Sequence, residues 1–132
     1  MAKYVLSLCV LLLFGCTTFQ GLSRLSSLES TSKAYGKAMR WGEYQVASSF
    51  IKTEETDRQS PNLKKLEKIK VTSYKPIEIN TSEDNLQAHQ TVEIKYYNTD
   101  YLIVKTLIDK QLWEYDEKQK VWYLQSALPD FK

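Results

Sequence analysis

The hydrophobic pattern of this chain changes its period once, near residue 69, and that change restricts the possible folds more than any other feature. Between residues 28 and 51 the apolar residues recur at helical spacing. From residue 69 onward they alternate with polar residues at a period of two, which is typical of strands with one buried face. The order predicts an α+β domain, with N-terminal helices packed on one face of a curved four-stranded antiparallel sheet.

The helical part is expected to form two helices. Thr31 or Ser32 can cap the first, and Gly42 is well placed to end it. The second helix carries its apolar residues on one side: Tyr44, Ala47, Phe50 and Ile51. Residues 52–61 are polar and end in a proline, which predicts a loop before one short helical turn.

Four strands in a meander are expected after the helices. The first contains Pro76, which cannot donate to a strand ladder, so we expect a bulge or an edge there. The second covers residues 88–97, and its inward residues are Ala88, Val92, Ile94 and Tyr96. A hairpin turn at residues 98–100 leads to a long central strand over residues 101–115. The last strand is predicted over residues 121–127.

The N-terminal segment has the features of an export signal. Lys3 precedes an apolar stretch of eleven residues, 4–14, which is interrupted only by Ser7. As a helix at ~1.5 Å per residue it would span about 16 Å, roughly half of a ~30 Å hydrocarbon core. A stretch of this length predicts a secretory signal peptide rather than a membrane span.

The residues "LFGC" that end at Cys16 resemble the lipobox of bacterial lipoproteins, with a leucine three places before the cysteine and a small residue directly before it. The resemblance implies a signal peptide at 1–15, cleavage before Cys16 and a lipid on its thiol. The Ser- and Thr-rich residues 16–29 then form a lipidated tether, and 30–132 the globular domain. In Gram-negative lipoproteins an Asp directly after the cysteine favours retention at the inner membrane. The residue here is Thr17, so in a Gram-negative host the resemblance implies the periplasmic leaflet of the outer membrane. A Gram-positive host implies the outer face of its membrane, and the alternative reading is a plain secretory peptide cleaved elsewhere.

Composition and charge argue against several function classes. The 18 basic and 16 acidic residues are interspersed, which does not favour a nucleic-acid partner. The densest basic stretch, residues 62–70, is typical of a solvated helix end or edge strand. His89 is expected on the polar side of its strand, and with one histidine and one lipidated cysteine we expect no metal and no cofactor. No glycine spacing fits a phosphate-binding loop.

The order of the elements, together with "AMRWGEYQVASSFI" (38–51) and "WEYDEKQKVWYLQSALPDF" (113–131), resembles small envelope lipoproteins with the nuclear transport factor 2-like fold, a cystatin-like cone. The similarity covers roughly residues 30–131. Some proteins of this fold do acid–base chemistry inside the cone, which makes Tyr35, Tyr96 and Asp109 the candidates for a pocket. A solvated carboxylate at a strand bend is the plainer interpretation of Asp109, and we expect no enzymatic activity.

Large residues lie on both faces of the strand expected over 101–115. Its two faces carry Leu102, Val104 and Ile108 on one side, and Tyr101, Ile103, Leu107 and Trp113 on the other. One face must pack on the helices, and the other would expose an apolar patch of the kind that marks interfaces.

These features predict a lipid-anchored periplasmic domain that binds a protein or lipidic partner through its sheet face. Its interface residues are Tyr101, Ile103, Leu107 and Trp113. The partner is a second copy in a sheet-to-sheet homodimer or another envelope protein, and one variant of the hypothesis is an accessory subunit of an envelope machine. The alternative is a small-molecule pocket inside the cone, with or without catalysis.

Overall fold

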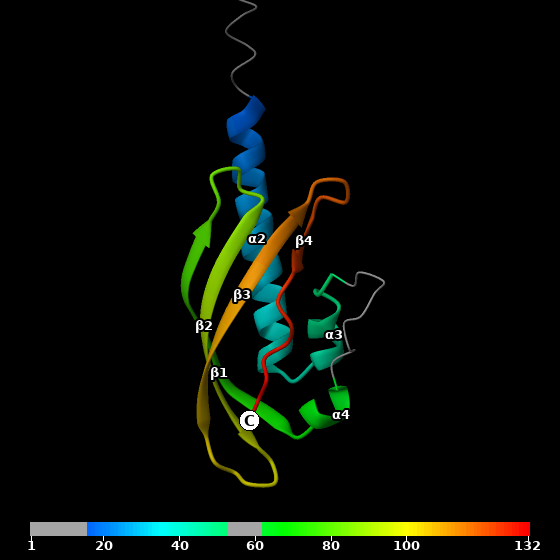
Figure 1. The fold of residues 1–132 in the computed structure, drawn as a ribbon, viewed down its shortest axis with the longest axis vertical. Coiled ribbons are helices and arrows are strands. Elements are labelled where there is room, and N and C mark those ends of the chain that lie inside the picture. Colours follow the sequence, from blue (N-terminus) through cyan, green and yellow to red (C-terminus); the bar gives the residue numbers. More distant parts are fainter. Residues whose placement is uncertain (1–15, 53–61) are drawn as a thin grey trace, which may run out of the picture.

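A computed structural model describes residues 16–52 and 62–132 of the chain, with side chains from Phe19 onward. The predicted signal peptide and nearly all of the predicted loop at 52–61 lie outside the described residues. Three helices come first, α2 (Cys16–Arg40), α3 (Tyr44–Ser48) and α4 (Leu63–Leu66). Four strands follow, β1 (Ile69–Thr81), β2 (Gln87–Asn98), β3 (Lys105–Asp116) and β4 (Val121–Leu124). They form one antiparallel sheet in the order β1-β2-β3-β4, on which α2 packs (Figure 1), so the expected α+β architecture is confirmed.

Helix α2 is one continuous element of 25 residues, so the prediction of a tether at 16–29 and of a cap at Thr31 or Ser32 is wrong. The N-terminal half of α2 is held by the sheet. The side chain of Leu28 is buried, and the indole Nε1 of Trp122 donates to the backbone oxygen of Arg24 at 3.0 Å. Tertiary contacts of this kind stabilise a helix whose local sequence would suit a linker.

Helix α2 ends where the sequence indicates. Gly42 has a φ of +73°, the left-handed conformation that closes many helices and that glycine adopts without strain. The amide of Glu43 reaches back to the carbonyl of Ala38 at 2.8 Å. The chain then enters α3, and the hydroxyl of Tyr44 donates to the backbone oxygen of Ile69 at 2.9 Å, which fixes α3 to the first strand.

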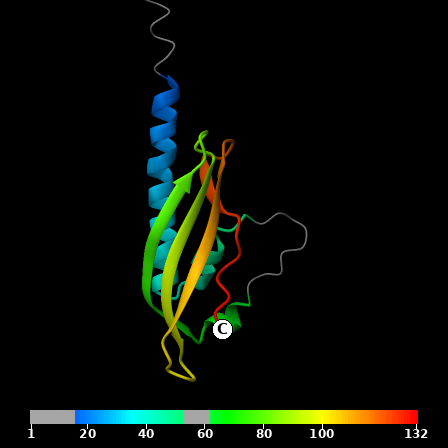
Figure 2. The ribbon, with the colours of Figure 1, turned by 60° about the vertical axis from the view of Figure 1, so that its left-hand side comes forward.

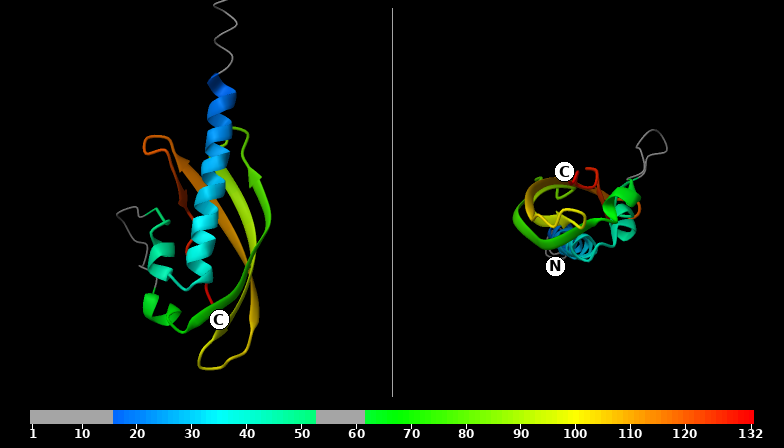
Figure 3. Two further views of the ribbon diagram at one scale, coloured as in Figure 1. Left: turned by 180° about the vertical axis from the view of Figure 1, so that it is seen from behind. Right: turned by 90° about the horizontal axis from the view of Figure 1, so that it is seen from below.

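The strand β2 matches its predicted pattern, whereas the buried alternation of β1 is confined to Ile69 and Val71, and Ile77 and Ile79 are exposed. Ala88, Val92, Ile94 and Tyr96 are all buried on one face of β2. The register between β1 and β2 shifts after Val71 and again after Pro76, which confirms the bulge expected at the proline. Figures 2 and 3 show the resulting curvature of the sheet, with α2 lying along one side of it. The core forms between these layers.

The hairpin between β2 and β3 differs from the prediction. Residues 101–104 belong to its loop rather than to a strand, and β3 begins at Lys105. The amides of Tyr101 and Leu102 both donate to the carbonyl of Asn98, at 3.0 and 2.8 Å, and Leu102 has a φ of +54°. Because of this turn, the four apolar residues 101–104 lie outside the sheet. The strand β4 also ends at Leu124, earlier than expected.

A glycine inside α2 sets the distance between the helix and the sheet. A Cβ atom at Gly36 would lie 2.6 Å from Cε1 of Tyr74 on β1, closer than real Cβ atoms approach another heavy atom. Only a residue without a side chain allows the ring of Tyr74 to lie against the helix backbone here.

Candidate functional site

A hydrogen-bonded group of polar side chains lies on the face of the sheet that packs against α2. Gln111 of β3 is its centre, and its Nε2 donates to the hydroxyl of Tyr74 at 2.9 Å and to Oδ2 of Asp109 at 2.7 Å. Trp113 Nε1 donates in turn to Oε1 of Gln111 at 3.2 Å. We call Tyr35, Tyr74, Asp109, Gln111 and Trp113 the polar cluster. Its buried amide is well satisfied, as buried polar groups must be.

Tyr35 of α2 closes the polar cluster from the helix side. It is fully buried, and its ring meets those of Trp113 and Tyr74 edge-on, at centroid distances of 5.5 and 6.4 Å. Its hydroxyl has no hydrogen-bond partner among the described residues. Burial raises the pKa of Tyr35, and the charge of Asp109 raises it further. Tyr35 is therefore a neutral phenol at any physiological pH.

The two other ionisable members of the cluster are also shifted toward their neutral forms. Burial raises the pKa of the Asp109 carboxyl above its usual range, and the hydrogen bond from Gln111 opposes that shift. Burial likewise raises the pKa of Tyr74. Asp109 is half-buried on the core face, so its description as a solvated carboxylate at a bend is wrong.

Of the three predicted pocket residues, the structure brings Tyr35 and Asp109 together, whereas Tyr96 lies apart from the cluster. The hydroxyl of Tyr96 donates to the backbone oxygen of Lys132 at 2.9 Å, and its ring packs on Phe131 at a centroid distance of 4.7 Å. Tyr96 and Asp109 do line a common groove of about 770 Å³ between β3 and the C-terminal segment. Tyr35 does not line that groove.

The polar cluster contains two residues that the sequence analysis did not single out, Tyr74 and Gln111. The alternation of faces along a strand would have predicted the place of Gln111. It is two residues from both Asp109 and Trp113 and therefore shares their face of β3. Tyr74 carried no such signal, since the register shift after Val71 decides which face it occupies.

The predicted interface residues separate into two groups. Trp113 is fully buried, and Leu107 is partly buried and packs against the core. The prediction that these two residues form a surface contact is therefore wrong. The outward face of β3 is mixed rather than apolar, because Thr106, Lys110 and Glu114 alternate with Ile108 and Leu112. The patch expected over that face is therefore absent from β3.

Tyr101 and Ile103, by contrast, lie in the hairpin loop with Leu102 and Val104, and all four side chains are between 58% and 73% exposed. We call these four residues the apolar tip. In Figures 1 and 3 the β2–β3 hairpin that carries it lies at the end of the molecule opposite the start of α2. Lys68 and Asp100 form an ion pair at 2.6 Å at the base of the hairpin.

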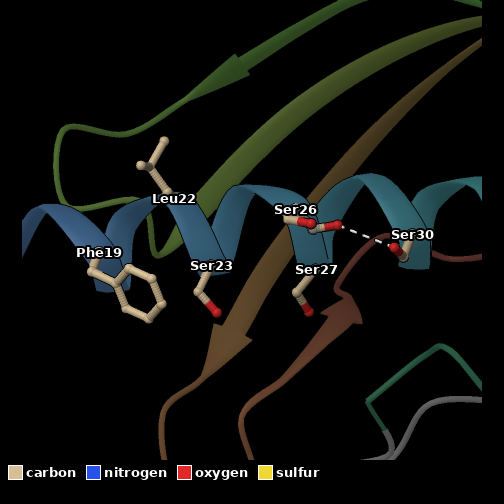
Figure 4. Close-up of a pocket in the computed structure, with 6 residues that line it drawn as sticks. All are labelled: Phe19, Leu22, Ser23, Ser26, Ser27 and Ser30. Atoms are coloured by element: carbon tan, nitrogen blue, oxygen red, sulfur yellow. Dashed lines mark hydrogen bonds between the residues drawn. The ribbon is translucent and has the colours of Figure 1, made fainter.

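The first turns of α2 carry a second exposed surface, close to the residue predicted to be lipidated, Cys16. Phe19 and Leu22 are both exposed there. Figure 4 shows them along one side of the helix with serines Ser23, Ser26, Ser27 and Ser30, which together line a hollow of about 490 Å³. The hydroxyl of Ser30 donates to the carbonyl of Ser26 at 3.2 Å, so part of this polar surface is turned back onto the helix.

Comparisons with known proteins give no match, whether with family models, curated proteins or solved structures. Within residues 16–52 and 62–132, His, Cys, Asp and Glu side chains form no group of three that could hold a metal ion. Over the same ranges no helix has the length and apolar character needed to cross a membrane. The apolar tip and the polar cluster are thus the two candidate sites.

Proposed function

We propose that this protein is a lipid-anchored, non-enzymatic binding domain of the bacterial envelope that engages a protein partner through the apolar tip. The observation that carries the proposal is the exposure of four consecutive apolar side chains, Tyr101 to Val104, at the end of a hairpin. Exposed apolar groups of this size are uncommon on soluble domains unless they serve an interface. A tyrosine beside aliphatic residues is also a composition typical of binding surfaces.

The position of the tip favours a partner that is not the anchoring membrane. In this proposal the lipid is attached to Cys16, the first residue of α2. A helix of 25 residues spans about 37 Å at ~1.5 Å per residue, and the tip lies past its far end. Arg24 holds α2 to the β3–β4 hairpin through an ion pair with Glu117 at 3.1 Å. A domain anchored through the start of this helix would hold the tip away from the bilayer. In a Gram-negative host that bilayer surface would be the periplasmic leaflet of the outer membrane.

The remaining features agree with this role. In the proposal the polar cluster is a structural element, because Tyr35 and Trp113 are fully buried and Gln111 is hydrogen-bonded within the cluster. Helices that precede a curved meander sheet support the further proposal that the domain is nuclear transport factor 2-like. The tip would then be an elaboration of the hairpin at one end of the cone.

A second candidate function is a small-molecule pocket formed around Tyr35. The observation that favours it is the buried hydroxyl of Tyr35, which lacks a partner among the described residues and lies within the electrostatic influence of Asp109. A ligand that supplies a hydrogen bond to this hydroxyl would bind less tightly after Tyr35→Phe. Equal affinity of the two proteins for such a ligand would exclude this candidate.

The test of the proposed function is the size of the native complex. Full chain solubilised from membranes in mild detergent is compared with the double variant Leu102→Ser, Ile103→Ser by sedimentation velocity. We expect the unaltered chain to sediment in a complex and the variant as a single chain in its detergent micelle. The matched control is Val46→Ser, Val121→Ser, which removes two exposed apolar side chains elsewhere and should keep the complex. The proposal would be contradicted if the control variant also lost the complex, or if the Leu102→Ser, Ile103→Ser variant retained it.

A further inference from the structure

Two adjoining grooves lie where the end of α2 meets β1, and they share Arg40, Trp41 and Thr72. One has a volume of about 570 Å³ and follows the last turns of α2 from Ser32 to Trp41. The other has a volume of about 290 Å³ and adds Lys70 and Tyr97 on the strand side. We call the two together the basic groove. It shares no lining residue with the apolar tip.

The charge of the basic groove is uniformly positive. Its charged lining residues are Lys33, Lys37, Arg40 and Lys70, and no acidic side chain among the described residues lines it. Lys33 is paired with Glu29 at 2.7 Å, but Lys37 and Lys70 form no ion pair within residues 16–52 and 62–132. Cations that converge on a hollow without compensating carboxylates attract an anionic ligand.

The inner wall of the groove contains a polar atom that needs a donor. Gln90 lines the groove and is only 7% exposed, and its Oε1 is buried with no hydrogen-bond partner in the described part of the chain. Buried side-chain acceptors in folded proteins nearly always have a partner, and a ligand hydroxyl in the groove supplies one when the amide of Gln90 turns toward it. Neighbouring hydroxyl groups come from Ser32, Thr72 and Ser73.

The rim of the groove carries an exposed aromatic ring. Trp41 is 69% exposed, and the guanidinium carbon of Arg40 lies 5.4 Å from the centre of its ring. Arg40 is itself fixed, because its Nη1 donates to the carbonyl of Val71 at 2.7 Å. An indole with one apolar surface and one polar N–H suits a ligand that is both ring-shaped and hydroxylated.

We propose that the basic groove binds an acidic saccharide. Carboxylates of the sugar face Lys37 and Lys70, a sugar ring lies against Trp41, and a sugar hydroxyl donates to Oε1 of Gln90. The chemistry combines three requirements, negative charge, a ring and a hydroxyl donor, which a neutral sugar or an acidic peptide meets only in part. The inference does not depend on a partner at the apolar tip.

The exposure of the three tryptophans provides a direct readout. Trp113 and Trp122 are buried at 0% and 1% exposure, so acrylamide quenching of tryptophan fluorescence reports mainly on Trp41. Full chain in detergent solution is titrated with trigalacturonic acid, with maltotriose as the neutral sugar and with triglutamate as the acidic peptide. We expect trigalacturonic acid to protect Trp41 in a saturable manner that weakens with added salt. Maltotriose and triglutamate should each bind at least tenfold more weakly.

Two variants assign the effect to the groove. Lys37→Glu, Lys70→Glu reverses two exposed charges and should weaken binding at least tenfold, whereas the matched control Lys110→Glu, Lys118→Glu, whose exposed lysines lie on β3 and in the β3–β4 hairpin, should not change it. Gln90→Leu should weaken binding severalfold, with an unchanged circular dichroism spectrum as the check of folding. The proposal is overturned if trigalacturonic acid gives no protection, if either comparison ligand binds equally well, or if both charge variants lose affinity alike.

Discussion

The contact between Gly36 and Tyr74 allows a prediction whose sign is opposite to the usual rule for helices. In an exposed helix interior, replacing glycine by alanine stabilises a protein by about 0.8–1.0 kcal/mol. At Gly36, however, the new Cβ would lie 2.6 Å from Cε1, 3.0 Å from Cδ1 and 3.3 Å from Cζ of the Tyr74 ring. Either the ring or the whole helix must move.

The cost of that movement can be worked from the surroundings of the ring. Forcing extra volume into a packed contact costs about 1–3 kcal/mol. Displacing the ring also disturbs the 2.9 Å hydrogen bond from Gln111 to the Tyr74 hydroxyl, worth about 0.5–1.5 kcal/mol. After subtraction of the helix-propensity gain, we expect Gly36→Ala to lower the free energy of unfolding by about 2 kcal/mol. In a domain of this size the melting temperature should fall by roughly 8 °C.

Urea unfolding of the full chain, followed by circular dichroism, measures this loss. The control is Gly21→Ala in the same helix, where the new Cβ meets only the side-chain Nδ2 of Asn85 at 3.2 Å. That variant should be neutral or more stable by up to about 1 kcal/mol. In a Tyr74→Ala background, Gly36→Ala should become stabilising, because the ring is gone. Stabilisation by Gly36→Ala with Tyr74 in place would refute the reasoning.

Three further outcomes follow from the structure. Burial raises the pKa of Asp109, so the native state binds the proton of this carboxyl more tightly than the unfolded state does. The stability that the bound proton contributes is complete below the unfolded pKa of about 3.9 and is lost as the pH rises through the native pKa. Asp109→Asn, whose amide oxygen still accepts from Gln111, should therefore be more stable than the unaltered chain at pH 7, and lower stability in urea unfolding at that pH would count against the burial argument. Trp113→Ala should cost about 3–5 kcal/mol in the same assay because the indole is fully buried, and a loss under 1 kcal/mol would contradict its place in the core. The Cys16→Ser variant should no longer be found in the membrane fraction and should lack the electrophoretic mobility shift of a lipidated chain. If the variant stayed in the membrane fraction, the lipid anchor would be disproved.

The sequence predicted those features that depend on the backbone chemistry of single residues. Gly42 ends α2 because few other residues adopt its positive φ without strain, and the register shifts after Pro76 because proline lacks an amide hydrogen. The inward residues of β2 also followed from simple alternation. These predictions needed no knowledge of distant contacts.

The errors arose where tertiary contacts overrule local pattern. The Ser-rich start of α2 has the composition of a linker, yet the burial of Leu28 and the hydrogen bond from Trp122 keep it helical. Residues 101–104 have the composition of a buried strand, but the turn at Asn98 and the positive φ of Leu102 place them outside the sheet. Leucine rarely adopts that conformation, so its residue type gave no warning.

Site-specific crosslinking from the apolar tip tests the proposed function most directly. A photoreactive amino acid is placed at Ile103 in the full chain in its host membrane, and in separate chains at the exposed control positions Val46 and Val121. We predict one discrete protein adduct from Ile103 and none from the controls, with a mass of two chains if the partner is a second copy. Adducts to lipid alone, equal adducts from all three positions, or none from Ile103 would contradict a protein-binding role for the tip.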